Sequence, residues 1–330
     1  VRNDAMSVDE IAAQKPERIV IAGKATLLTA NAFYLFEEAR EDVVAIGRTN
    51  QGLGNFLPHL DARYESIEKM SHQVGPEQIL AQKPDLFIVK DFMYRSLGRQ
   101  VAKLGVPTLA LSLESPQKFA RDIERIGKAV RSEKQAGHII EEYQTRLEEI
   151  TEKTEELGDG EKPRTLLLYY SRRGGETAFN IAPKKWIQTF QVEAAGGDPV
   201  WTDTHVGRGW MTINFEQIAA WDPDHIFITS FHTAPQDYID DILDDPRWEA
   251  LRAVQNGNVE AVPTDFYSWA QPDTRWILGV QWMAKRLHPE LFSELDMMQE
   301  AKEFYTELYR LDSSTYEEVV LPRLEEEISE

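Results

Sequence analysis

Residues 77–88 read Glu-Gln-Ile-Leu-Ala-Gln-Lys-Pro-Asp-Leu-Phe-Ile, and residues 216–227 read Glu-Gln-Ile-Ala-Ala-Trp-Asp-Pro-Asp-His-Ile-Phe. The two stretches align without a gap, 139 residues apart (216 minus 77). Each one reads as a helix, then a turn at Pro-Asp, then a short apolar strand. Pro-Asp before a strand is a common turn, so one match of this kind can arise by chance. Two lobes related by a pseudo-twofold axis explain the repeat at least as well.

Short apolar runs alternate with helical patterns along both halves of the chain. In the first half the predicted strands span residues 18–23, 42–47, 85–89 and 107–111, with helices at 27–39, 77–82 and 97–104. In the second half the predicted strands span 165–170, 224–229 and 259–262, followed by helices at 272–287 and around 297–309. Buried strands that alternate with helices are typical of a parallel sheet, so the sequence predicts an α/β protein.

The middle of the chain is helical. Apolar residues recur at helical spacing from Phe119 to Val130, and Ser132 with Gln135 has the spacing of a capping box that opens a second helix. Residues 133–156 contain no Pro and one Gly, and as a helix they would span roughly 36 Å. We therefore expect an N-terminal lobe (1–114), linking helices (115–162) with this long helix as a rigid spine, and a C-terminal lobe with a helical tail (163–330).

Composition excludes several classes of protein. The chain has 330 residues, a net charge of −20 and no Cys, which rules out disulfides and thiolate metal sites. The negative charge argues against nucleic acid as a partner. No apolar run approaches the ~20 residues of a membrane helix. The first residues lack a signal segment, so either such a segment was removed or the chain is cytoplasmic. An acidic protein that binds an anion must concentrate its cations at the site.

Motifs of catalysis and metal binding are missing from the sequence. There is no phosphate-binding loop and no Gly-x-Ser-x-Gly elbow, and Gly23-Lys24-Ala25-Thr26 lacks the spaced glycines of a dinucleotide site. None of the seven His forms an i,i+3 or i,i+4 pair, so we expect no metal site. The strongest enzymatic alternative is a metal chelatase that would use His232 with Glu114.

Several segments together resemble a known family: the ABC-importer binding proteins for siderophores, heme, vitamin B12 and, in some members, molybdate or tungstate. They are Lys15–Val20, Gly105-Val106-Pro107, the two repeated stretches, Trp248–Val259 and Trp269–Trp282. The resemblance implies two Rossmann-like lobes joined by a single long helix, a ligand held in the cleft between them, and no enzymatic activity or cofactor. It also implies a monomer that is periplasmic or extracellular, with an anchoring lipid on a segment absent from this sequence as one possibility.

The same resemblance implies that Glu77 and Glu216 match the two acidic residues that dock onto a membrane permease, which works with its ATPase. A charge that complements the helix dipole is the other explanation for a Glu at the start of each helix. The paired recurrence of this Glu favours docking.

Ligands of open α/β lobes meet the loops at the carboxyl ends of strands. This rule, with the family pattern, selects a set of candidates. In the first lobe they are Lys24, Thr49, Asn50 and Lys90, and in the second Arg172, Arg173, Trp210, His232, Tyr267, Trp269 and Arg275.

Three arginines supply the expected positive charge. Arg172 and Arg173 are adjacent, and which of them faces the cleft stays open. Arg275, in the first turn of a helix, either binds an anion or forms a buried pair with Asp273. Tyr267 and Trp269 are expected to wall the ligand rather than fill the core.

The expected ligand is an anionic iron complex of the siderophore type. Molybdate or tungstate is the alternative within the same family. Heme would require an axial ligand, for which Tyr267 or His232 are the candidates, and a corrinoid also stays open.

Overall fold

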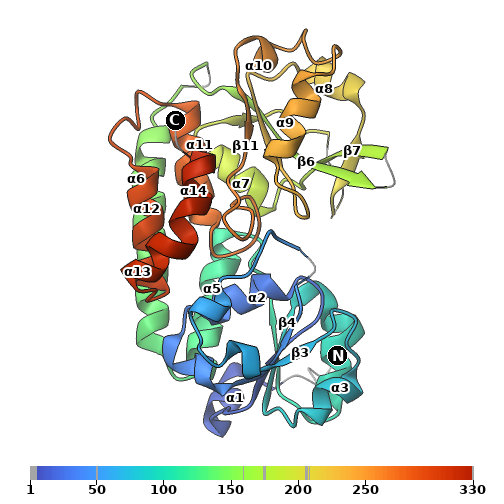
Figure 1. Cartoon of the computed structure of the whole chain (residues 1–330), viewed down its shortest axis with the longest axis vertical. Helices are drawn as coiled ribbons and strands as arrows, with labels where there is room; N and C mark the ends of the chain where they lie inside the picture. The colour runs from blue at the N-terminus through green and yellow to red at the C-terminus, as the bar shows by residue number, and fades with distance from the viewer. Residues whose placement is uncertain are drawn as a thin grey trace. The chain divides into compact units, whose positions relative to one another are not determined.

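A computed structural model describes residues 6–49, 51–158, 160–173, 176–204, 207 and 209–328. The chain divides into two compact units (Figure 1). Unit 1 contains the residues up to 51, together with 55–142 and 303–316, and unit 2 contains 52–54, 143–302 and the residues from 317 onward. The helical tail is thus shared between the units, whereas the sequence assigned all of it to the second lobe. Within the described ranges, no helix is both long and apolar enough to cross a membrane.

Unit 1 is built on a five-stranded parallel sheet of order β3-β2-β1-β4-β5. The strands are β1 (Ile19–Ile21), β2 (Val43–Gly47), β3 (Glu68–Met70), β4 (Leu86–Lys90) and β5 (Thr108–Leu111). All residues of the central strands β1 and β4 are buried, as expected for a sheet covered on both faces. The edge strand β3 was not predicted, because only one of its three residues is buried.

Helices of unit 1 precede, connect and follow these strands along the chain (Figure 1). They are α1 (Val8–Gln14), α2 (Thr26–Phe33), α3 (Pro76–Ala81), α4 (Arg99–Lys103) and α5 (Pro116–Ala129). The helix predicted at 27–39 is shorter than expected: α2 ends at Phe33, and a 3₁₀ turn (Glu37–Asp42) leads into β2.

Unit 2 contains a mixed sheet of order β11-β10-β6-β7-β9, with β8 paired to β6. Its strands are β6 (Arg164–Arg173), β7 (Glu176–Ile181), β8 (Asp198–Pro199), β9 (Met211–Ile213), β10 (His225–Thr229) and β11 (Val259–Ala261). Strands β11, β10 and β6 are parallel, as predicted, whereas β6 and β7 form an antiparallel hairpin. The α/β class predicted from the sequence is confirmed.

The helices of unit 2 are α7 (Ile187–Ala194), α8 (Phe215–Trp221), α9 (Gln236–Leu243), α10 (Arg252–Gln255), α11 (Trp276–Leu287), α12 (Met297–Glu303) and α14 (Leu321–Ile328); α13 (Ser313–Thr315) belongs to unit 1. Helix α11 is almost fully buried and packs against α7. Both cover the sheet of unit 2 on the same side (Figure 1).

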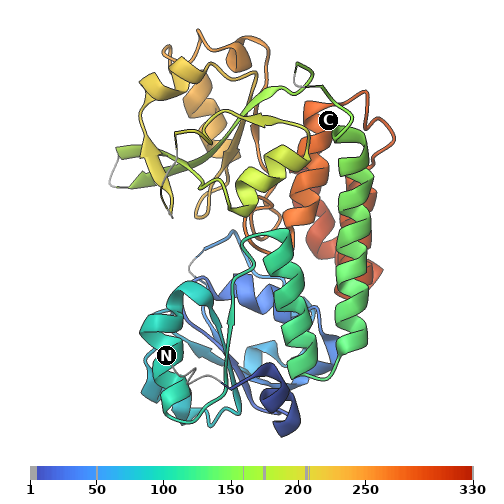
Figure 2. The ribbon, with the colours of Figure 1, turned by 180° about the vertical axis from the view of Figure 1, so that it is seen from behind.

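The predicted spine is α6 (Glu133–Thr154), 22 residues long, which at 1.5 Å per residue gives about 33 Å. The chain passes from unit 1 to unit 2 within this helix, after Glu142. In unit 2, Arg146 of α6 pairs with Glu300 of α12 at 2.5 Å. This buried pair holds the two helices side by side, as the view from behind also shows (Figure 2).

The sequence repeat is also a structural repeat. In unit 1, the left-handed residue Lys83 lies between α3 and β4, two residues after the helix ends. In unit 2, the equivalent left-handed residue, Asp222, directly follows α8 and precedes β10. The Asp that follows each Pro accepts a backbone hydrogen bond at the start of the neighbouring strand. Asp85 accepts it from N of Arg18, the residue before β1, at 2.8 Å, and Asp224 from N of Arg164, the first residue of β6, at 2.9 Å.

The two arginines of this motif also make matching bonds through their side chains. Each guanidinium donates to the last turn of the repeated helix, Arg18 to Gln82 O and Arg164 to Trp221 O, both at 2.7 Å. Gln82 and Trp221 are equivalent positions of the repeat. The motif therefore connects the end of a helix to the start of a parallel strand in both units. This favours a structural repeat over a chance match of sequence.

Candidate functional site

Two of the four candidates in unit 1 are exposed at carboxyl ends of strands. Lys24 lies in the turn between β1 and α2, and Thr49 follows β2, where its hydroxyl accepts a bond from Gln51 N at 3.2 Å. Asn50 lies outside the described residues. Lys24 and Thr49 are both exposed, and their role in ligand binding stays a prediction.

Lys90, unlike Lys24 and Thr49, is buried. It ends β4 and is only 2% exposed, and its ammonium donates to Glu114 Oε1 at 2.7 Å and to the carbonyl of Ser112. The charge of Lys90 is therefore compensated inside unit 1, where it joins the ends of β4 and β5. The carboxylate that the chelatase alternative required is engaged in the same pair.

The arginine pair lies at the end of β6, which continues into a hairpin with β7 instead of leading into a helix. Arg172 is exposed and pairs with Asp241 of α9 at 2.8 Å. The side chain of Arg173 lies outside the described part of the chain. An exposed pair of this kind is easily exchanged for water or for an anionic ligand.

The loop before α11 is more buried than its polar sequence predicts. Tyr267, Trp269 and Arg275 are 1%, 0% and 0% exposed. The guanidinium of Arg275 contacts Asp265 Oδ1 and Asp273 Oδ1, both at 2.7 Å, and Trp269 Nε1 donates to Asp265 Oδ2 at 3.2 Å. Burial raises the pKa of the Tyr267 phenol well above its ordinary value.

This placement differs from the ligand-facing role expected for the three residues. The loop is polar because its side chains bond to one another, and the core of unit 2 contains them as a hydrogen-bonded cluster around Asp265 and Asp273. Of the two roles left open for Arg275, the structure shows the buried pair with Asp273.

Four aromatic side chains meet where the parallel pairing of β6 and β10 ends. We call Tyr169, Trp186, Trp210 and Phe231 the aromatic cluster. Tyr169 stacks on Phe231 with ring centroids 4.1 Å apart and planes at 17°. Trp210 lies 5.1 Å from Tyr169 and meets Trp186 edge-on at 5.6 Å. Phe231 is buried and the other three are half-buried, so the cluster presents aromatic surface to solvent.

Basic residues flank the aromatic cluster in the sequence. Lys184 and Lys185 are exposed and directly precede Trp186, and the exposed His232 directly follows Phe231. The strand-end rule pointed to His232 and its neighbour Phe231, and the family pattern pointed to Trp210. Tyr169, Trp186 and the two lysines were not predicted. The signal available was position. Tyr169 lies where the parallel pairing of β6 with β10 ends, Phe231 follows β10 by two residues, and Lys-Lys-Trp stands immediately before α7.

The two predicted docking residues occupy equivalent places. Glu77 lies in the first turn of α3 and Glu216 in the first turn of α8, and both are exposed. Each side chain is thus available to a partner, and each also complements the dipole of its helix.

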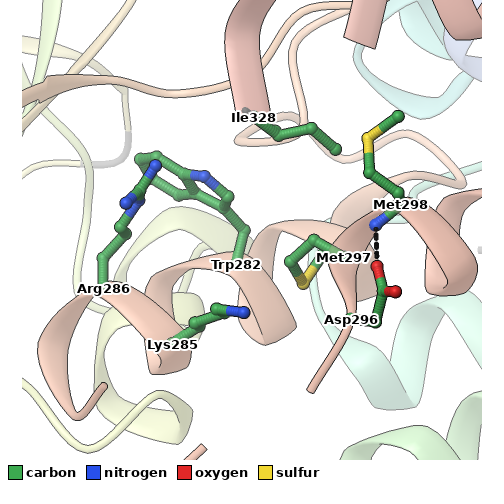
Figure 3. Close-up of a pocket in the computed structure, with 7 residues that line it drawn as sticks. All are labelled: Trp282, Lys285, Arg286, Asp296, Met297, Met298 and Ile328. Carbon is green, nitrogen blue, oxygen red and sulfur yellow. Dashed lines mark hydrogen bonds between the residues drawn. The ribbon is translucent and has the colours of Figure 1, made fainter. Parts of the chain in front are cut away.

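Unit 2 also contains a pocket of about 280 Å³ between α11, α12 and α14 (Figure 3). Met297, Met298 and Ile328 lie on one side of Trp282 and Arg286 on the other. The charged groups bond within the protein: Lys285 donates to Leu295 O at 2.7 Å, Arg286 pairs with Glu260 at 3.1 Å, and Asp296 caps α12. The pocket is therefore a weaker candidate than the aromatic cluster. In the described ranges, no three His, Asp or Glu side chains are grouped to hold a metal ion.

Comparison with known proteins identifies the family. Residues 68–265 match the family described as periplasmic binding protein. The molybdate-binding protein MolA of Haemophilus influenzae is 21% identical over 300 residues, covering 86% of this chain and 84% of MolA. The achromobactin-binding periplasmic protein of Dickeya dadantii is 21% identical over 69% of this chain and 76% of its own length.

Solved structures share the fold. MolA bound to molybdate superposes with a TM-score of 0.71 at 18% identity, covering 89% of this chain and 93% of MolA. CeuE of Helicobacter pylori with Ni(II) bound superposes with a TM-score of 0.71 at 20% identity, covering 93% of this chain and 95% of CeuE. This chain belongs to the periplasmic binding protein family.

Proposed function

We propose that this solute-binding protein, a component of an ABC transporter and not an enzyme, carries an anionic iron complex of the siderophore class. The observation that supports the proposal is the aromatic cluster. Three of its four rings are half-buried, and Trp186 and Phe231 are adjacent in the sequence to exposed basic residues. A ligand with flat, partly apolar groups gains from stacking on such rings. A bare oxyanion gains little from them, because it needs hydrogen-bond donors.

Charge supports an anionic ligand in particular. The whole chain carries −20, so an anion approaches against a repulsive field unless cations lie at its site. Lys184, Lys185 and Arg172 supply local positive charge in unit 2, and Lys24 does so in unit 1. Arg172 is paired with Asp241 at the surface, so its contribution is smaller than that of an unscreened cation.

Molybdate or tungstate is the second candidate. The molybdate-binding relative aligns over 86% of this chain, more than the 69% of the achromobactin-binding relative. An oxyanion would use the loop amides and hydroxyls, such as those at Thr49, rather than the rings.

A calorimetric titration tests the choice of ligand. The probes are a ferric tris-catecholate complex and sodium molybdate. The variants are Trp210→Ala and, as a matched control, Trp221→Ala, a half-buried Trp at the end of α8. We expect Trp210→Ala to weaken binding of the ferric complex about three- to tenfold, since an aromatic contact contributes roughly 1 kcal/mol, and Trp221→Ala to leave it unchanged. Molybdate binding that is equal in all three proteins, with no binding of the ferric complex, would overturn the proposal in favour of the second candidate.

Family membership implies a periplasmic location and a membrane permease as partner. We propose that Glu77 and Glu216 are the docking contacts. Reversal of either charge to Lys should abolish uptake in a reconstituted importer while ligand affinity stays intact. A fall in ligand affinity instead would mean that these residues serve the binding site.

A further inference from the structure

A cation lies beside one of the two docking residues. The guanidinium carbon of Arg247 is 5.4 Å from the ring centroid of Phe215, the residue before Glu216 in the first turn of α8. Asp245 accepts three bonds from this guanidinium: Nε donates to Oδ1 and to Oδ2, both at 3.0 Å, and NH2 donates to Oδ2 at 2.6 Å. The Arg247 side chain is 64% exposed. The bonds to Asp245, and to a lesser degree the field of Glu216, raise the pKa of Arg247.

The ring that supports this arginine is particular to unit 2. At the offset of the sequence repeat, Glu77 corresponds to Glu216, but Pro76 stands where unit 2 has Phe215. A proline offers no π face for a guanidinium. The two copies of the docking helix therefore differ in the residue that would carry a neighbouring cation.

We propose that Arg247 attenuates the docking of Glu216 onto a basic surface of the permease. The inference rests on the docking function proposed above. Arg247 offsets part of the negative potential at the start of α8 and also neutralises Asp245, so an approaching cationic partner meets a weaker field. Capture of the protein by the transporter is then slower than two unshielded carboxylates, Glu216 and Asp245, would allow.

Removing the charge should therefore strengthen docking. Arg247→Met keeps an apolar stem on Phe215 and exposes Asp245 as a second acid. Exposed charges near an interface act mainly on the association rate, with effects of roughly 1.5- to 5-fold that shrink as salt rises. We expect the association rate to rise by about this factor at low ionic strength and the difference to vanish at high salt.

The experiment measures association with the permease–ATPase complex of the same importer, reconstituted in nanodiscs, by surface biosensing at two salt concentrations. The matched control is Arg252→Met. Arg252 is also exposed and also pairs with Asp side chains, Asp222 at 2.8 Å and Asp224 at 2.7 Å, but at the end of α8 opposite to Glu216. Glu216→Gln is measured in parallel. Thermal unfolding of each variant verifies that it is folded.

The outcomes separate the two proposals. Faster association for Arg247→Met than for Arg252→Met, together with slower association for Glu216→Gln, supports the inference. Slower association for Glu216→Gln without a gain for Arg247→Met overturns the inference and leaves docking intact. An unchanged rate for Glu216→Gln overturns the docking proposal, and this inference with it.

Discussion

Replacement of Arg275 by Met would leave two fully buried carboxylates without the guanidinium that joins them. Asp265 and Asp273 are both 0% exposed, and each contacts Arg275 at 2.7 Å. Removing one partner of a buried ion pair costs about 3–5 kcal/mol, because the remaining charge is desolvated and uncompensated. Here one arginine serves two acids, so we expect a loss toward the upper end of this range.

The matched control is Arg172→Met. Arg172 pairs with Asp241 at a similar distance, 2.8 Å, but the two side chains are 47% and 36% exposed. Solvent screens such a pair, so its loss should cost about 0–1 kcal/mol. The Arg–Asp distances are therefore nearly the same at Arg172 and Arg275, and the two sites differ mainly in how deeply the charges are buried.

Urea unfolding followed by tryptophan fluorescence measures the difference. All eight Trp lie between residues 186 and 282, inside unit 2, so the signal reports the unit that contains Arg275. A loss below about 1 kcal/mol for Arg275→Met, with a clear loss of ligand affinity, would refute the structural role and restore Arg275 to the ligand site. Adding Asp265→Asn and Asp273→Asn to Arg275→Met should recover part of the stability, because it removes the stranded charges.

Three further predictions concern stability. Asp85→Ala and Asp224→Ala should each lower the free energy of unfolding in urea by roughly 1–3 kcal/mol, because each removes the acceptor of backbone hydrogen bonds at the start of a strand. A loss of stability in only one of the two variants would argue against equivalent roles in the repeat. Burial lowers the pKa of His225, so the unfolded chain binds more protons than the folded one near and below pH ~6.5. The free energy of unfolding should therefore fall as pH drops through that range, less steeply in His225→Gln, and equal slopes would contradict this. Lys90→Met should destabilise unit 1, because it leaves the carboxylate of Glu114 without its partner. The double variant Lys90→Met with Glu114→Gln should unfold at a higher temperature than Lys90→Met alone. A lower unfolding temperature for the double variant would contradict this role of the pair.

The parallel strands and the long helix could be predicted because each has a strong local signal. Strands β1, β2, β4 and β10 are apolar runs buried on both faces, and α6 has an uninterrupted helical pattern. Strands β3 and β9 have three residues each, of which one is buried in β3 and none in β9, so their sequences carry too little information. Their pairing depends on the sheet that is already present.

The candidate site was harder to predict because burial and pairing are properties of the tertiary structure. A polar loop that contains Asp265, Asp273 and Arg275 reads as exposed, yet its charges neutralise one another in the core. Lys90 was selected by its place at a strand end, which was correct, but its partner lies on the loop after the next strand. The aromatic cluster joins residues more than sixty positions apart, Tyr169 and Phe231 among them, which no local pattern connects.

Native mass spectrometry of the protein purified from its own host tests the central claim most directly. The account predicts an adduct that contains iron and an organic chelator, that is released when the protein is acid-denatured, and that is reduced in Trp210→Ala relative to Trp221→Ala. An adduct with the mass of molybdate or tungstate, present equally in both variants, would contradict the siderophore-class ligand and the role of the aromatic cluster.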